Sequence, residues 1–129
     1  MAVEQVESYK KNKPQATQYL DQLKEIAYHM KDCILEEDIE GLGKLLTHDW
    51  KVKTEFNPLL TTDFMRTLNK IVMKNGGLGG RVCGAGGGGC FIWLVKPENK
   101  EEIATLLDNQ KGKLLNYKFM ERGLEITPI

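Results

Sequence analysis

Residues 81–95 read RVCGAGGGGCFIWLV, which places a glycine-rich run between two apolar segments. Segments 81–83 and 90–95 are short and rich in β-favouring residues, so we expect them to be strands of one sheet. Nine of the 13 glycines lie between residues 76 and 89. Because glycine loses more conformational freedom on folding than any other residue, such a run is expected where the backbone needs positive φ or approaches another group closely.

Upstream of this run, apolar residues recur three and four positions apart, which predicts amphipathic helices. Three segments have this pattern, at residues 14–37, 38–50 and about 61–75. Residues 51–60 are expected to form a loop with a turn at Asn57-Pro58, and Thr61 or Thr62 is expected to cap the helix that follows. The chain therefore enters the glycine run from a helix.

Downstream, residues 99–112 predict one more helix, with Asn99 as its N-cap. Apolar and polar residues then alternate in segments 115–119 and 123–127, the pattern of a closing antiparallel hairpin. Helices followed by strands, with one helix between the strands, predict an α+β fold. We expect a two-layer sandwich with a mainly antiparallel sheet and helices packed on one face. The length of 129 residues fits a single domain over residues 1–129.

The charge balance excludes several classes of partner. Eighteen Lys and Arg residues offset 18 Asp and Glu residues, so the chain lacks the charge of a general nucleic-acid or anionic-membrane binder. The longest apolar run, residues 90–95, is too short to cross a bilayer, and the first seven residues do not resemble a secretory signal. We expect a cytoplasmic protein with no nucleic-acid or membrane partner.

The polar side chains give little sign of catalysis. His29 and His48 have no Ser or Cys partner at the spacing of a catalytic triad, so no catalytic residue is identified. Three cysteines fit neither a disulfide framework nor a zinc site, and no other metal site is identified. We expect Cys33, Cys83 and Cys90 to be reduced, mostly buried thiols.

The glycine loop itself leaves two interpretations open. Unencumbered amides can form a nest for phosphate, but a tight connection between strands is the simpler alternative. A dinucleotide fingerprint is rejected because a strand rather than a helix follows the loop, and a Walker loop is rejected because no Gly-Lys-Ser or Gly-Lys-Thr closes it. Arg81 is the nearest cation, and it is either a phosphate contact or a solvated strand-end residue.

A family resemblance narrows these alternatives. The stretch GGRVCGAGGGGCF, residues 79–91, resembles the third conserved motif of the GHMP kinases, a family that includes galactokinase, homoserine kinase and mevalonate kinase. Residues 23–31, 45–46 and 50–53 resemble the branch that contains the D-glycero-D-manno-heptose 7-phosphate kinases. The resemblance covers about residues 15–127.

The resemblance implies a ferredoxin-like sandwich, the form of the C-terminal domain in that family. It also implies that the glycine loop packs beside the ATP-phosphate loop and helps to shape the substrate cleft. The residues expected to contact substrate or phosphate are Arg81, Lys53, Gly84, Ala85, Gly86, Gly87, Gly88 and Gly89. The phosphate loop, the magnesium-binding acid and the catalytic Asp of the family belong to an N-terminal domain, and this sequence contains none of their motifs.

The sequence therefore predicts the C-terminal, cleft-forming domain of an ATP-dependent sugar kinase with a sugar-phosphate substrate, most like heptose 7-phosphate. We expect ATP and Mg²⁺ to act in the complete enzyme, and neither to be a cofactor of this chain alone. The expected partner is an N-terminal GHMP kinase domain, in the same chain or a separate one, without which the chain is inactive. The alternative is a freestanding ferredoxin-like module that binds a small anion and regulates a partner.

Overall fold

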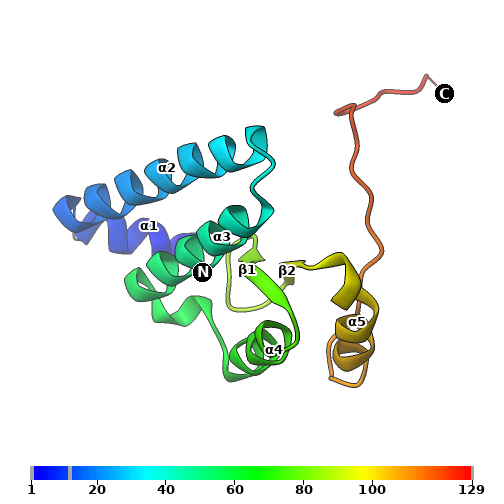
Figure 1. Cartoon of the computed structure of the whole chain (residues 1–129). Coiled ribbons are helices and arrows are strands. Elements are labelled where there is room, and N and C mark those ends of the chain that lie inside the picture. The colour runs from blue at the N-terminus through cyan, green and yellow to red at the C-terminus, as the bar shows by residue number, and fades with distance from the viewer. Residues whose placement is uncertain (1, 12, 129) are drawn as a thin grey trace.

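A computed structural model describes residues 2–11 and 13–128 (Figure 1). Helices and one β-hairpin follow each other along these residues. Their bounds are α1 (Ala2–Lys11), α2 (Lys13–Leu35), α3 (Ile39–Phe56), the 3₁₀ turn η1 (Pro58–Leu60), α4 (Asp63–Lys74), β1 (Gly77–Cys83), β2 (Cys90–Val95), the 3₁₀ turn η2 (Pro97–Asn99) and α5 (Lys100–Asp108).

Side-chain caps explain where the central helices begin. The Asp38 carboxylate accepts a hydrogen bond from the Gly41 amide at 2.8 Å at the start of α3, and the Thr62 hydroxyl accepts one from the Met65 amide at 3.2 Å at the start of α4. The helices α2, α3 and α4 confirm the three helices predicted upstream of the glycine run. The second runs on to Phe56, beyond its expected end, and stops only at the turn before Pro58.

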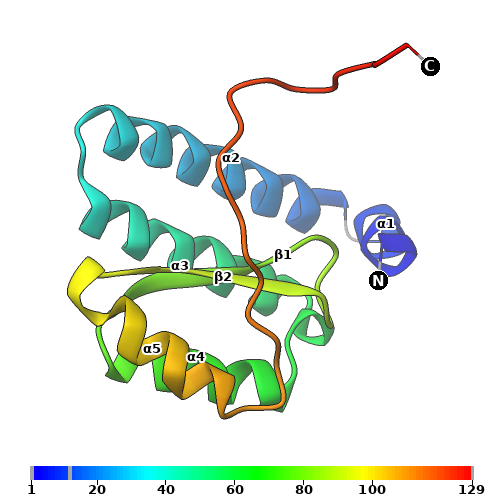
Figure 2. The same ribbon diagram turned by 90° about the vertical axis from the view of Figure 1, so that its right-hand side faces the viewer.

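The sheet consists of β1 and β2, paired antiparallel with Arg81 opposite Ile92 and Cys83 opposite Cys90. Side chains alternate between its faces. Arg81 reaches Asp49 on α3, whereas the Trp93 indole N–H donates to Asn69 on α4 at 3.0 Å. Figure 2 shows the same arrangement, with α2 and α3 on one side of the strands and α4 and α5 on the other. The α+β class and the antiparallel pairing are confirmed, but the helices line both faces of the hairpin rather than one.

The predicted closing hairpin over segments 115–119 and 123–127 was wrong. Residues 109–128 contain no helix or strand, and Figure 1 shows them running away from the rest of the chain. Phe119 and Leu124 are 92% and 93% exposed. An alternating pattern marks which side of a strand is apolar, but a strand also needs a neighbour for its backbone hydrogen bonds, and an isolated hairpin is marginal in water.

The buried core lies between the helices and the hairpin. Its apolar members are Ala16, Ile26, Val52, Leu60, Met65, Val72, Val82 and Ile103. Cys33 is half-buried, while Cys83 and Cys90 are exposed, so the prediction of mostly buried thiols was wrong. The two exposed cysteines lie where the hairpin opens into the glycine loop, beyond the end of the packed core. No helix in the described part of the chain is long and apolar enough to span a membrane.

Candidate functional site

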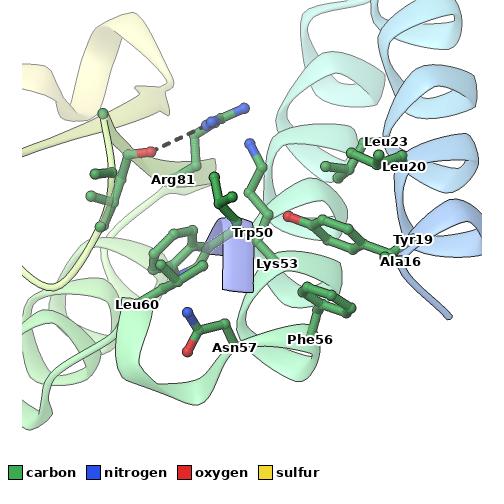
Figure 3. Close-up of a pocket in the computed structure, with 15 residues that line it drawn as sticks. Ala16, Tyr19, Leu20, Leu23, Trp50, Lys53, Phe56, Asn57, Leu60 and Arg81 are labelled. Atoms are coloured by element: carbon green, nitrogen blue, oxygen red, sulfur yellow. Dashed lines mark hydrogen bonds between the residues drawn. The ribbon is translucent and has the colours of Figure 1, made fainter. Parts of the chain in front are cut away.

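A pocket of about 520 Å³ lies between α2, α3, η1 and the end of β1 (Figure 3). We call it the Arg81 pocket. It is lined by Val6, Ala16, Tyr19, Leu20, Leu23, Trp50, Lys53, Phe56, Asn57, Leu60, Arg81, Val82, Gly84, Ala85 and Gly86. Most of these side chains are apolar, and the charged groups, Lys53 and Arg81, lie on the sides formed by α3 and β1. This combination is typical of pockets that orient a small ligand through a few polar contacts.

Aromatic rings form much of the pocket wall. Tyr19 on α2 and Phe56 on α3 stack with centroids 4.1 Å apart and planes 7° from parallel. Trp50 meets the edge of Phe91 at 6.1 Å, and Phe91 stacks on Trp93 at 4.0 Å. These rings join α2 to α3 and α3 to β2, so the wall is built from elements that support each other.

A charged cluster stands beside these rings. Asp49 is 5% exposed, and its Oδ2 lies 2.7 Å from Arg81 Nη1 and 3.1 Å from Lys53 Nζ. Asp49 and Lys53 share one face of α3 because they are four residues apart, and Arg81 reaches them from β1. The two cations approach Asp49 Oδ2 as ion pairs rather than as well-directed hydrogen bonds. One carboxylate against two cations leaves a net positive charge in the pocket.

The pKa values of neighbouring groups reflect this packing. Burial lowers the pKa of Lys53 from its ordinary 10.5, while Asp49 opposes the shift and Arg81 adds to it. Burial also raises the pKa of the Tyr19 hydroxyl, and here Asp49 adds to the shift while Arg81 opposes it. Figure 3 shows the Tyr19 hydroxyl and the Lys53 ammonium on the same side of the pocket as Arg81. A ligand there would meet two cations and a protonated phenol.

Asp49→Asn should lower the pKa of Lys53 further, because the carboxylate is what favours its charged form. NMR titration of ¹³C-dimethylated lysines would measure this, with exposed Glu55→Gln as a control that leaves Lys53 unchanged. A Lys53 titration that moves upward in Asp49→Asn would contradict the prediction.

The lowered pKa of Lys53 also affects the stability of the wild type. The unfolded chain holds the Lys53 proton up to about pH 10.5, whereas the folded chain loses it at a lower pH. The unfolding free energy should therefore rise with pH through the window that ends at 10.5.

The glycine loop is docked on η1. The Gly87 amide donates to the Leu60 carbonyl at 2.8 Å, and a Cβ at Gly86 would lie 2.8 Å from Leu60 Cδ2. Positive φ occurs at Gly84, Gly86, Gly87 and Gly89, as expected for a glycine run, but not at Gly88. Since the Gly87 amide already has a protein partner, it is not one of the open amides of a phosphate nest.

Gly87→Val should lower the unfolding free energy by about 1–3 kcal/mol, because a β-branched residue is strained at its φ of 71°. Gly88→Val is the matched control: no atom lies within 4 Å of the Cβ position and φ is not positive, so we expect a change below about 0.5 kcal/mol. Urea denaturation measures both. Equal losses in the two variants would contradict the strain assigned to the positive φ of Gly87.

The structure brings together only part of the predicted site. Arg81, Lys53 and the pocket-lining residues Gly84, Ala85 and Gly86 lie around one cavity, whereas Gly87, Gly88 and Gly89 are not part of its lining. Sequence reasoning missed Asp49 and Tyr19. The available signal was the four-residue spacing of Asp49 and Lys53, which is also the spacing of an ordinary exposed helix pair.

The residues described do not fit a divalent cation. No group of three or more His, Cys, Asp or Glu side chains within residues 2–11 and 13–128 is placed to hold a metal ion. Asp49, the buried carboxylate that pairs with the lining residues Lys53 and Arg81, already faces two cations. Mg²⁺ needs oxygen ligands that are free of such competitors.

Comparison with known proteins identifies the family of this chain. Residues 30–113 match the family described as GHMP kinases C terminal, which covers more than half of the chain. The chain belongs to this family. The match includes α3, the charged cluster, the glycine loop and both strands.

Several curated kinases are similar to this C-terminal GHMP domain. D-glycero-alpha-D-manno-heptose 7-phosphate kinase from Campylobacter jejuni is 24% identical over 93% of this chain and 36% of its own length. Mevalonate kinase from Thermococcus gammatolerans is 31% identical over 74% of this chain and 28% of its own length, and that from Pyrococcus furiosus is 27% identical over 85% and 34%. The chain thus spans about a third of the length of these relatives.

Proposed function

We propose that this chain is the substrate-binding C-terminal domain of a sugar kinase that transfers the γ-phosphate of ATP to a hydroxyl of a sugar phosphate, with heptose 7-phosphate as the substrate. The observation that carries the proposal is the Arg81 pocket, in which two cations share one buried carboxylate beside aromatic rings. The similarity to a heptose 7-phosphate kinase over 93% of the chain supports the same substrate class.

The chemistry of the pocket favours a phosphate among anionic substrates. Arg81 can offer two parallel N–H groups to a phosphate, and Lys53 can add a point charge next to it. The excess positive charge of the cluster then meets a group that carries close to two negative charges. Mevalonate is also an anion, but its carboxylate carries one charge. The rings of Tyr19, Trp50 and Phe56 offer apolar faces to the carbon skeleton of the sugar.

The remaining parts of the reaction fall to another domain. Phosphoryl transfer depends on positioning the phosphates and neutralising their charge with metal ions and cations. As the resemblance to the GHMP kinases implies, we assign ATP and Mg²⁺ to an N-terminal GHMP kinase domain, in the same chain or a separate one. The role of the Arg81 pocket is to hold and orient the acceptor, and the chain alone is inactive.

Calorimetric titration of the purified chain tests the proposal. We expect saturable binding of heptose 7-phosphate, weaker binding of mevalonate and of unphosphorylated heptose, and no measurable binding of Mg-ATP. Turnover should appear only when the N-terminal domain is joined to the chain. Micromolar binding of Mg-ATP by the chain alone would contradict the assignment of domains. Anion binding without turnover in the joined protein would favour the alternative of a regulatory anion-binding module.

A further inference from the structure

The neck of the glycine loop carries two thiols that face each other across the hairpin. Cys83 ends β1, Cys90 begins β2, and the two are direct partners in the antiparallel register. Directly opposed residues in such a ladder have Cα atoms about 4.5–5.5 Å apart and side chains on the same face. A disulfide needs a Cα separation of about 4.4–6.8 Å, so either kind of antiparallel pair satisfies it.

Both thiols are open to reagents, since Cys83 and Cys90 are free and exposed. Alternation along β1 puts Cys83 on the same face as Arg81, the face that α3 covers. Burial is the main cause that lowers the pKa of Lys53, and the Cys83 thiolate is among the groups that raise this pKa. Lys53 therefore lies within electrostatic reach of Cys83.

We propose that Cys83 and Cys90 form a reversible disulfide that closes the neck of the glycine loop and is made by exchange with a low-molecular-weight disulfide such as oxidised glutathione. The pair is a modification site separate from the chemistry of the Arg81 pocket. It does not depend on which substrate the pocket takes.

The exchange balances in two steps. The Cys83 thiolate attacks one sulfur of oxidised glutathione, which forms a mixed disulfide and releases one glutathione thiolate. The Cys90 thiolate then attacks the Cys83 sulfur and releases the second glutathione. The two protein thiols lose two electrons and two protons, and the two glutathione molecules gain them. An excess of reduced glutathione or another thiol reverses both steps.

The bond would act on the loop that lines the pocket. It closes a ring over residues 83–90, which the docking of Gly86 and Gly87 also holds against Leu60. Gly84 and Gly86 line the Arg81 pocket, so the bond would hold one edge of its wall at the end of the hairpin. Disulfides in reducing compartments are usually transient or redox-sensing, which fits a pair with two exposed sulfurs.

The test uses the whole chain equilibrated with mixtures of reduced and oxidised glutathione, acid-quenched, alkylated with iodoacetamide and digested with trypsin. Residues 82–100 form one tryptic peptide with both cysteines, while Cys33 falls in residues 32–44. We expect the chain to lose two of its three thiols. Peptide 82–100 should lack both alkyl groups and weigh two hydrogen atoms less than its reduced form, while Cys33 stays alkylated.

Single substitutions provide the controls. Cys33→Ser should leave the oxidation of peptide 82–100 unchanged. Cys83→Ser and Cys90→Ser should each convert the internal disulfide into a glutathione adduct on the cysteine that remains. The proposal is overturned if the wild-type peptide carries glutathione at equilibrium, if it stays fully alkylated where Cys33 is already oxidised, or if Cys33 is linked to either cysteine.

Discussion

Gly79→Ala is expected to lower the unfolding free energy by about 3 kcal/mol, the upper part of the usual range for overpacking. A Cβ at Gly79 would overlap the carbonyl oxygen of Gly43 and lie 2.8 Å from Thr47 Oγ1. Gly43 is also tightly packed from the other side, since its own Cβ would lie 2.6 Å from the Leu78 carbonyl oxygen. Here α3 and β1 meet backbone to backbone, and no side chain can rotate away.

The sign of this effect follows from two magnitudes. Replacing glycine by alanine usually stabilises by about 0.4–1 kcal/mol through the unfolded chain, which is smaller than the cost of separating α3 from β1. Gly88→Ala is the control, because its Cβ would meet nothing within 4 Å and its φ is not positive. Urea denaturation should therefore place Gly79→Ala well below the wild type, with Gly88→Ala at or slightly above it. A wild-type midpoint for Gly79→Ala would mean that α3 and β1 do not pack this closely.

The glycines Gly79, Gly87 and Gly88 illustrate what the sequence could and could not predict. The concentration of glycines predicted close backbone approach or positive φ, and both occur. It could not assign the two roles to individual residues. Gly79 is needed for packing against Gly43, Gly87 for its φ of 71°, and Gly88 for neither. A run of identical residues contains no periodicity from which such differences could be inferred.

The helices and the first hairpin were predictable because their signals are local. The cap at Thr62 and the three-to-four spacing of apolar residues depend on neighbours a few positions away. The closing hairpin failed for the opposite reason. Alternation between residues 115 and 127 defines an apolar side for a strand, but strand formation depends on a partner that local sequence does not specify.

The candidate site was likewise predictable where its signals are local and not where it depends on contacts between distant parts of the chain. Arg81 was predicted from its place next to the glycine loop, and Lys53 only through the family resemblance. Asp49 was missed because an acid four residues before a lysine usually marks a solvated helix face. What makes Asp49 different is the arrival of Arg81 from β1, a contact between distant parts of the chain. Buried charge clusters of this kind become visible only when the tertiary packing is known.

Arg81→Ala is expected to weaken binding of heptose 7-phosphate by about 1.5–3 kcal/mol, roughly 10- to 150-fold, because a charge-assisted contact to phosphate is lost. The unfolding free energy should also fall, by about 2 kcal/mol. Removing one partner of a buried charge costs about 3–5 kcal/mol when nothing replaces it, and here Lys53 remains 3.1 Å from Asp49 Oδ2. Calorimetry measures the first effect and urea denaturation the second.

Two comparisons separate binding from folding in this prediction. Arg122→Ala removes an exposed arginine that pairs with Glu125 in the C-terminal segment, and it should change neither quantity. Arg81→Lys keeps the charge opposite Asp49 but not the two parallel N–H groups, so it should restore most of the stability and only part of the affinity. In the enzyme joined to its N-terminal domain, the KM for ATP should change less than the KM for the sugar phosphate. An Arg81→Ala variant that loses stability but binds heptose 7-phosphate like the wild type would leave Arg81 as a structural partner of Asp49 and remove it from the substrate site.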